Sequence, residues 1–261
     1  MSADCKAEGE DNLRKGADGA GNILLVADSH LVQGSCECQE FMRMLDVISG
    51  YTGLDVAFLG DIMDLWIAKP RYEDEIQIGF CNWCLQEKDR RKIYFVEGNH
   101  EFFVARRHGA SIGITSEGRI EAEGIVFAHG HDIQEGRLGF NRLFIRFCKS
   151  TFSSIALDFM PMGRRFAEWV KRRMGSRGDF NCRDYIPMDR VEKWAAGLAR
   201  GGARDIFIGH FHMGAECIVG PNASCHVLAP WMGTGNVTLF NAASRKTHTG
   251  NWQAILQDLR R

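Results

Sequence analysis

Five short motifs rich in histidine and acidic residues occur along this chain, and their residue types could bind metal ions. In order they are Asp28-Ser29-His30, Gly60-Asp61-Ile62-Met63-Asp64, Gly98-Asn99-His100-Glu101, His129-Gly130-His131-Asp132 and Gly209-His210-Phe211-His212. They hold six of the nine histidines in the chain. Imidazole nitrogens and carboxylate oxygens are the groups that divalent transition metals bind in proteins. The motifs therefore predict an enzyme with a metal centre.

Seven donors in these motifs would fill two metal sites that share one ligand, and Asp61 is the natural bridging carboxylate. The Asp-x-His and His-x-His spacings would place two donors on one side of an extended strand end. Glycines at 60, 98, 130 and 209 would let the backbone turn sharply beneath the ions. The other six ligands divide into Asp28, His30 and His212 for one metal, and Asn99, His129 and His210 for the second.

Two divalent ions about 3.5–4 Å apart can hydrolyse a phosphoester, because they lower the pKa of water and neutralise charge on the phosphoryl oxygens. We expect Asp61 and His100 to be the catalytic residues. His100, beside ligand Asn99, would contact the phosphate or protonate the leaving oxygen. Manganese suits a mixture of nitrogen and oxygen donors without thiolate, and zinc and iron remain alternatives.

Two further motif residues have supporting roles. Asp64 either caps the helix that follows it or forms a hydrogen bond with His30. His131 is expected to orient a ligand or the phosphate rather than to bind a metal itself.

Each motif directly follows a short, continuously apolar run, which is typical of a strand buried on both faces. The segments 38–49 and 75–90 between these runs have helical spacing of apolar residues. Alternating strands and helices predict an α/β fold with the ligands at the carboxyl ends of the strands. After the last motif, the β-like runs 225–229, 236–240 and 252–256 predict a meander that completes a second sheet.

The composition is that of one globular domain. The chain has 261 residues, is 45% hydrophobic and carries a net charge of −1, which gives no global signal for nucleic acid. Residues 1–21 are polar and predict a disordered leader, and 22–261 form the domain. Nine cysteines, an odd number without a secretory signal, indicate a reducing cytoplasm rather than a disulfide framework. No obligate protein partner is evident.

The segment between the fourth and fifth motifs is strongly basic. Residues 137–177 contain ten Lys or Arg and two acids, a net charge of +8. Aromatic and aliphatic residues recur with helical spacing on both sides of Pro161. We expect a basic, amphipathic helical cap inserted at about 137–194 over the metal end of the sheet. It would face a lipid or membrane surface, and two solvated helices packed on the core are the alternative.

The five motifs together resemble the calcineurin-like metallophosphoesterase family, whose pattern is D-x-H, G-D-x-x-D, G-N-H-[DE], a His-Gly motif and G-H-x-H. The resemblance covers residues 23–212 and includes every block. It implies a four-layer αββα double-sheet sandwich, a bimetal centre and hydrolysis of a phosphoester.

A narrower resemblance is to the UDP-2,3-diacylglucosamine hydrolase branch of lipid A biosynthesis, which also has a basic helical cap in this position. It implies cleavage of UDP-2,3-diacylglucosamine to UMP and 2,3-diacylglucosamine 1-phosphate at the cytoplasmic face of the inner membrane. Substrate contacts would come from Asn141, Arg142 and Arg146 in the cap. Many enzymes of this branch have Arg in place of His100 and a single His with Asp in the fourth motif.

Two other functions stay open on the sequence. His100 also fits a soluble phosphodiesterase or phosphatase that acts on a nucleotide, phosphoprotein or other small phosphoester. A non-catalytic scaffold with the same fold would be expected to lose metal ligands, whereas every ligand position is filled here.

Overall fold

A computed structural model describes residues 21–134, 147–159, 165, 169 and 185–260. The strands of the first sheet are β1 (Asn22–Val26), β2 (Leu54–Phe58), β4 (Ile93–Val96), β6 (Ile114–Ser116), β12 (Asn236–Asn241) and β13 (Lys246–Asn251). The strands of the second sheet are β7 (Arg119–Ala122), β8 (Ile125–Ala128), β9 (Asp205–Ile208), β10 (Ala215–Gly220) and β11 (Ala223–Val227). A short third sheet pairs β3 (Trp66–Ile67) with β5 (Glu101–Phe102).

Both large sheets combine neighbouring parallel strands with antiparallel strands, at one end of the first sheet and at both ends of the second. The first has the order β13-β12-β1-β2-β4-β6, in which β1, β2, β4 and β6 are parallel. The second has the order β10-β11-β9-β8-β7, in which β11, β9 and β8 are parallel. The strand ends that carry the five motifs therefore lie at the carboxyl edges of the parallel strands of the two sheets.

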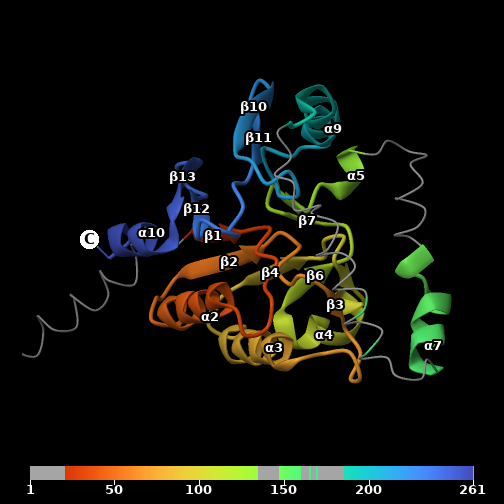
Figure 1. Cartoon of the computed structure of the whole chain (residues 1–261). Helices are drawn as coiled ribbons and strands as arrows, with labels where there is room; N and C mark the ends of the chain where they lie inside the picture. Colours follow the sequence, from red (N-terminus) through yellow and green to blue (C-terminus); the bar gives the residue numbers. More distant parts are fainter. Residues whose placement is uncertain (1–20, 135–146, 160–164, 166–168, 170–184, 261) are drawn as a thin grey trace, which may run out of the picture.

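Helices cover the outer face of each sheet (Figure 1). The described helices are α2 (Cys36–Ser49), α3 (Glu75–Glu87), α4 (Val104–Ile112), α5 (His131–Gln134), α7 (Thr151–Phe159), α9 (Met188–Arg200) and α10 (Trp252–Asp258). α2 and α3 lie on the first sheet, and α9 lies on the second (Figure 1). The predicted four-layer αββα arrangement is confirmed.

The side chains of β1 show why the apolar runs are continuous. Leu24 and Val26 point into the core shared with α2 and α3. Ile23 and Leu25 point the other way, into the core between the two sheets, where they share a cluster with Phe207 of the second sheet. A strand between two apolar layers needs apolar residues at every position, because neither face meets water.

The two helices on the first sheet begin at capping residues. The side chain of Ser35 accepts a hydrogen bond from the backbone N–H of Cys38 at the start of α2. Asp74 and Gln77 form a reciprocal capping box at the start of α3. Asp74 therefore caps the helix after the second motif, and the expectation that Asp64 might do so is wrong, because β3 lies between Asp64 and α3.

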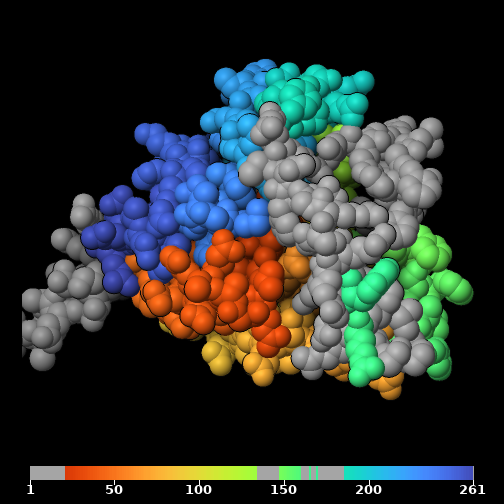
Figure 2. All heavy atoms as spheres, viewed as in Figure 1, coloured from red at the N-terminus to blue at the C-terminus, as the bar shows by residue number. Residues whose placement is uncertain are grey.

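The C-terminal part differs from the prediction in two ways. β12 pairs with β1, so the run 236–240 extends the first sheet instead of completing the second. The run 252–256 lies in helix α10, which Asn251 caps and which buries Trp252, Ile255 and Leu256. Spacings of three and four place these residues on one helical face, a pattern that a short apolar run does not distinguish from a strand. In Figure 2 these C-terminal elements (dark blue) lie against the N-terminal ones (orange and red).

Most of the predicted cap, and all but the last residue of the predicted leader, lie outside the described residues. The described portion includes α7, whose side chains are largely exposed, and α9. The expected end of the cap near residue 194 falls inside α9, which packs Val191 and Ala195 against the second sheet. In the described segments, no helix is both long and apolar enough to cross a membrane.

Candidate metal centre

Backbone hydrogen bonds join the loops that carry the motifs. His30 N–H donates to Asp61 O at 2.9 Å, and Leu31 N–H donates to Ile62 O at 3.0 Å, so the first two motifs run side by side. Trp66 N–H donates to His100 O at 2.9 Å, as part of the pairing of β3 with β5. The second and third motifs are thereby held together beyond the ends of β2 and β4.

The backbone is left-handed at most of the predicted ligands, so the extended geometry expected for the Asp-x-His and His-x-His motifs is wrong. Among the described residues, eight other than glycine have positive φ, and five of these are predicted ligands. Such a conformation costs about 1–3 kcal/mol and persists only where the surrounding structure enforces it. The left-handed turns bend the chain directly after β1, β2 and β9. The five ligands are Asp28 (52°), His30 (44°), Asp61 (51°), His210 (74°) and His212 (54°).

Two motif glycines allow a very close approach of side chains from other motifs. A Cβ atom on Gly98 would lie 2.0 Å from Oδ1 of Asp61. A Cβ atom on Gly60 would lie 2.6 Å from Nδ1 of His129, and the φ of Gly60 is +85°. No residue larger than glycine fits at these positions while the metal-ligand side chains stay in place.

The ligand set predicted for one metal converges. One donor atom from each of Asp28, His30 and His212 lies within 4.8 Å of the others. Nε2 of His30 is 3.2 Å from Nε2 of His212, and Oδ1 of Asp28 is 3.8 Å from the latter. Asp28 is fully buried.

The ligand set predicted for the other metal converges beside the first. Donor atoms of Asp61, His129 and His210 lie within 4.8 Å of one another. Oδ1 of Asn99 is 3.1 Å from Nε2 of His129. Oδ2 of Asp61 is 3.2 Å from Nε2 of His129 and 3.9 Å from Nε2 of His30. Asp61 therefore stands between the two sets, where a bridging ligand belongs.

The arrangement of donors fits cations better than protons. Nε2 of His129 is 3.2 Å from Asp61 Oδ2, and it is 3.1 Å from both Asn99 Oδ1 and His210 Nδ1. One proton on this nitrogen could serve only one of those acceptors, whereas a cation could serve all of them. Within the described structure, no hydrogen bond reaches the buried Oδ1 of Asp28. Nδ1 of His129 lies 2.8 Å from the carbonyl of Leu59, which leaves Nε2 directed at the cluster.

The pKa values at the centre reflect burial together with the charges of neighbouring carboxylates and imidazoles. Burial raises the pKa of Asp28 to about 7. Burial also opposes the charge of Asp61, but His129 and His100 beside it hold the pKa of Asp61 well below its usual value. Burial alone would lower the pKa of His129, but Asp61 raises it to about 9. Burial lowers the pKa of His30 to about 3, which keeps this imidazole neutral, as a metal ligand must be.

The predicted supporting residues lie at the edge of the cluster. The backbone N–H of His100 donates to Oδ1 of Asp61 at 2.9 Å, and Nδ1 of His100 is 2.6 Å from the carbonyl of Asp64. The side chains of His30, Asp64 and His100 bring one donor atom each within 4.8 Å of one another. The ring of His131 is 5.5 Å from that of His129. The three predicted contacts from the cap, Asn141, Arg142 and Arg146, lie outside the described residues.

Glu101 supports the centre, although the sequence pattern assigned no role to it. Its Oε2 accepts hydrogen bonds from the backbone N–H groups of Gly98 (2.7 Å) and Asp61 (3.1 Å), and its Oε1 accepts from Ile62 (2.8 Å). Burial and the charge of Asp61 raise the pKa of Glu101 to about 7. One fully buried side chain thus holds the second and third motifs together. The signal for this role in the sequence was an acidic residue at the first position of a short strand.

The pair formed by Glu97 and Lys149 had no signal in the sequence. Nζ of Lys149 is 3.1 Å from Oε2 of Glu97 and donates to the carbonyl of Gly98 at 2.8 Å. Glu97 is fully buried, and it also accepts from the backbone N–H of Ala105 at 2.7 Å. The two charged residues are 52 positions apart, and no local pattern relates them.

Comparison with known proteins identifies the family. The calcineurin-like phosphoesterase family matches residues 21–214 of this chain. A UDP-2,3-diacylglucosamine hydrolase from Shewanella loihica is 26% identical over 204 residues, which cover 72% of this chain and 80% of that protein. Vacuolar protein sorting 29 from Cryptosporidium parvum is 12% identical with a TM-score of 0.43, covering 88% of this chain and 95% of that one. A metallophosphoesterase from Sphaerobacter thermophilus is 13% identical with a TM-score of 0.38, covering 92% of each chain.

The family match spans all five motifs and most of the chain. The structure brings the donor residues of these motifs, which extend along the chain from Asp28 to His212, to one edge of the two packed sheets. The chain therefore belongs to the calcineurin-like phosphoesterase family and is a metal-dependent phosphoester hydrolase.

Proposed function

We propose that the protein cleaves the pyrophosphate of UDP-2,3-diacylglucosamine, releasing UMP and 2,3-diacylglucosamine 1-phosphate for lipid A biosynthesis. The observation that carries the reaction type is the convergence of two donor sets around Asp61. The substrate is inferred from the name of the Shewanella loihica relative and from the basic segment 137–177.

In this proposal two divalent ions, most simply manganese, are held with Asp61 between them. Bound ions would lower the pKa of the attacking water and offset charge on the phosphoryl oxygens. Asp61 is kept in place by the hydrogen bond from His100 N–H to its Oδ1, so its Oδ2 faces the metals. The remaining ligands are Asp28, His30 and His212 for one ion, and Asn99, His129 and His210 for the other.

We assign His100 the role of proton donor to the leaving group. A carbonyl oxygen only accepts hydrogen bonds, so Nδ1 of His100 carries the proton in its 2.6 Å contact with Asp64 O. Its Nε2 is then the nitrogen that can hold a proton for the leaving oxygen or contact the phosphate. Asp64 helps to fix this ring through its backbone carbonyl.

The cap is proposed to meet the cytoplasmic face of the inner membrane. On α7 the side chains of Phe152, Ile155 and Phe159 are 70%, 53% and 83% exposed. The helix is tied to the core through Lys69, whose Nζ lies 2.7 Å from Asp158, and through Tyr72, which donates to the carbonyl of Leu157. Exposed apolar side chains next to a basic segment suit the surface of an anionic membrane.

Release of UMP tests the proposal directly. Purified protein with manganese should produce UMP from UDP-2,3-diacylglucosamine presented in mixed micelles. Asp61→Ala is the matched negative control, because it removes the bridging carboxylate. Robust hydrolysis of a soluble phosphodiester without UMP release would sink the lipid assignment and keep the phosphoesterase.

That outcome would favour a soluble phosphodiesterase or phosphatase, for which His100 at the metal edge is the supporting feature. Replacing Phe152, Ile155 and Phe159 together by Ser separates the two functions. The three side chains are exposed, so the fold should survive. A lipid enzyme should lose turnover of vesicle-borne substrate selectively, whereas a soluble enzyme should show parallel rates on both substrates.

A further inference from the structure

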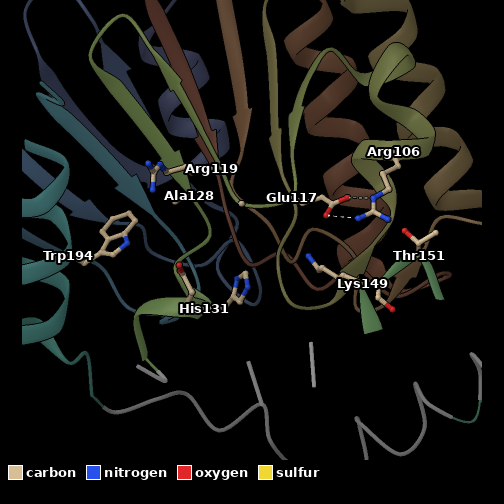
Figure 3. Close-up of a pocket in the computed structure, with 11 residues that line it drawn as sticks. Arg106, Glu117, Arg119, Ala128, His131, Lys149, Thr151 and Trp194 are labelled. Carbon is tan, nitrogen blue, oxygen red and sulfur yellow. Dashed lines mark hydrogen bonds and ion pairs between the residues drawn. The ribbon is translucent and has the colours of Figure 1, made fainter. Parts of the chain in front are cut away.

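A cavity of about 610 Å³ lies next to the metal centre (Figure 3). Its volume is within the range of roughly 300–1,000 Å³ usual for small-molecule sites. It is bounded by α4 and the β6–β7 turn on one side, by the start of α7, and by α9. Trp194 and Arg119 lie on one side of His131, and Lys149 lies on the other with the Arg106–Glu117 ion pair (Figure 3).

Two lining residues of the cavity lie beside the metal centre. The ring of His131 is 5.5 Å from that of His129 and 6.2 Å from that of His210. Lys149 donates to the carbonyl of Gly98, the residue before Asn99. A phosphate held at the metal centre would therefore lie close to this cavity, within reach of a substituent that occupies it.

The lining suits a polar aromatic group and does not suit an acyl chain. Trp194 is the one large apolar side chain of the lining, and Ala128 is the one aliphatic side chain. The other lining residues are charged or polar, or they are glycine. Burying a fatty acyl chain against such groups gains little, because the hydrophobic contribution scales with apolar area. An aromatic ring could stack on Trp194 while its polar substituents remain solvated or hydrogen-bonded.

Two basic side chains of the lining, Arg119 and Lys149, can contact an anion. Arg119 pairs with Glu121 through side chains that are 50% and 57% exposed, and such surface pairs contribute little. A phosphate could therefore replace Glu121 as the partner of Arg119 at low cost. Lys149 is held by Glu97 beside the metal loop, and Asp132 and the paired Glu117 supply the negative charge of the lining.

We propose that this cavity binds the nucleoside monophosphate half of the substrate, with the base against Trp194 and the phosphate beside the metal centre, where Arg119 from the Trp194 side and Lys149 from the opposite side could contact it. This rests on the proposed function, because it presumes a nucleotide-linked substrate. The acylated sugar then lies on the other side of the phosphate, toward the exposed apolar residues of α7. Trp194 determines specificity for the base, and Arg119 contributes to the affinity for the phosphate.

Calorimetric titration of the manganese-loaded protein with UMP and with ribose 5-phosphate tests the proposal. Both carry the same phosphate and sugar, so they differ only in the base. UMP should bind at least about tenfold more tightly than ribose 5-phosphate. Trp194→Ala should abolish that difference, and Trp194→Phe should keep most of it, because a phenyl ring still stacks. Equal affinity of the wild type for the two compounds would overturn the proposal.

Arg119→Ala provides a variant at an exposed position where folding is not at risk. It should weaken the binding of both compounds severalfold, whereas Arg90→Ala, at an exposed arginine that pairs with buried Glu87 outside the cavity, should change neither. Wild-type UMP affinity in Trp194→Ala would refute the stacking. UMP binding that depends on Trp194 in an enzyme inactive on UDP-2,3-diacylglucosamine would keep the cavity and discard the lipid substrate. Turnover of the lipid substrate, together with a UMP affinity that does not depend on Trp194, would keep the lipid substrate and discard the cavity as the nucleotide site.

Discussion

The two carboxylate oxygens of Asp61 have different partners. Oδ1 accepts the hydrogen bond from the backbone N–H of His100, and Oδ2 lies between His129 and His30. At the scale of residues, the centre thus depends on the side chain of Asp61. The hydrogen bond to its Oδ1 fixes the rotamer, and its Oδ2 directs the negative charge toward His129 and His30. Gly98 makes this possible, because any Cβ there would collide with Oδ1.

Asp61→Ala should reduce turnover of any phosphodiester by at least about 100-fold, because the bridging carboxylate is lost. Initial rates with saturating manganese measure this, and a far-ultraviolet dichroism spectrum checks the fold. His100→Ala is the companion variant: it should lower turnover and leave the metal content unchanged, since no predicted ligand is removed. Wild-type rates in Asp61→Ala would refute the bimetal mechanism.

Glu101→Gln should lower metal affinity or activity by about 10- to 100-fold although the side chain touches neither metal nor substrate. Glutamine keeps the shape but replaces one acceptor oxygen with an N–H₂ donor. At least one backbone N–H among Gly98, Asp61 and Ile62 would then be buried without an acceptor, at a cost of about 1–3 kcal/mol. Metal titration followed by activity separates affinity from turnover. Unchanged manganese affinity and kcat would show that Glu101 does not position Asp61.

At the scale of elements, short pairings beyond the strand ends join the ligand loops. β3 follows the second motif and β5 begins at Glu101, the last residue of the third motif, so their pairing joins the loops of Asp61 and Asn99 into one unit. Lys149, from the segment that precedes α7, reaches the same unit through Glu97 and Gly98. The contacts of Lys149 with Glu97 and Gly98 therefore join the cap segment to the loop of the third motif.

Lys149→Met should both destabilise the protein and reduce activity, because it leaves Glu97 buried without its cation. Breaking one side of a buried pair costs about 3–5 kcal/mol. Burial already raises the pKa of Glu97, and loss of Lys149 should raise it further. Urea unfolding measures the stability loss. The double variant Lys149→Met/Glu97→Gln should regain much of the stability without regaining activity, since the bond to Gly98 O stays absent. Full recovery of kcat/KM in the double variant would exclude a positioning role for Lys149.

At the scale of the whole molecule, the centre joins the two sheets. The first three motifs follow strands of the first sheet, and the last two follow strands of the second. Apolar contacts and ion pairs such as Arg245–Asp205 already join the two sheets, and the ligands are a further connection between them. Metal binding should therefore contribute to global stability.

Removal of metal with a chelator should lower the thermal unfolding midpoint. Manganese at 100 times its dissociation constant stabilises the native state by about 2.7 kcal/mol, which corresponds to roughly 5–10 °C for a chain of this size. Differential scanning calorimetry with and without manganese measures the shift. Asp61→Ala should show a much smaller shift. An equal midpoint for wild type with and without manganese would contradict a centre that spans both sheets.

Much of the site could be predicted from the sequence because its signals are local. Residue types at the ends of apolar runs identify the ligands, and continuous apolarity identifies strands buried on both faces. Local patterns were ambiguous for 252–256, where Trp252, Ile255 and Leu256 form one face of a helix. The polar strand β13 had no apolar signal, and it exists because it pairs with β12 at a sheet edge.

The sequence by itself determined the donor atoms, their order along the chain and the strands that end beside them. Only the tertiary structure decided the left-handed turns at Asp28 and Asp61, since their local cost is met by contacts with other motifs. It also decided that Glu101 and Lys149 hold the loops, and that Trp194 faces a cavity beside the metals. Such contacts join residues distant in sequence, and their energies arise only when the two sheets are packed together.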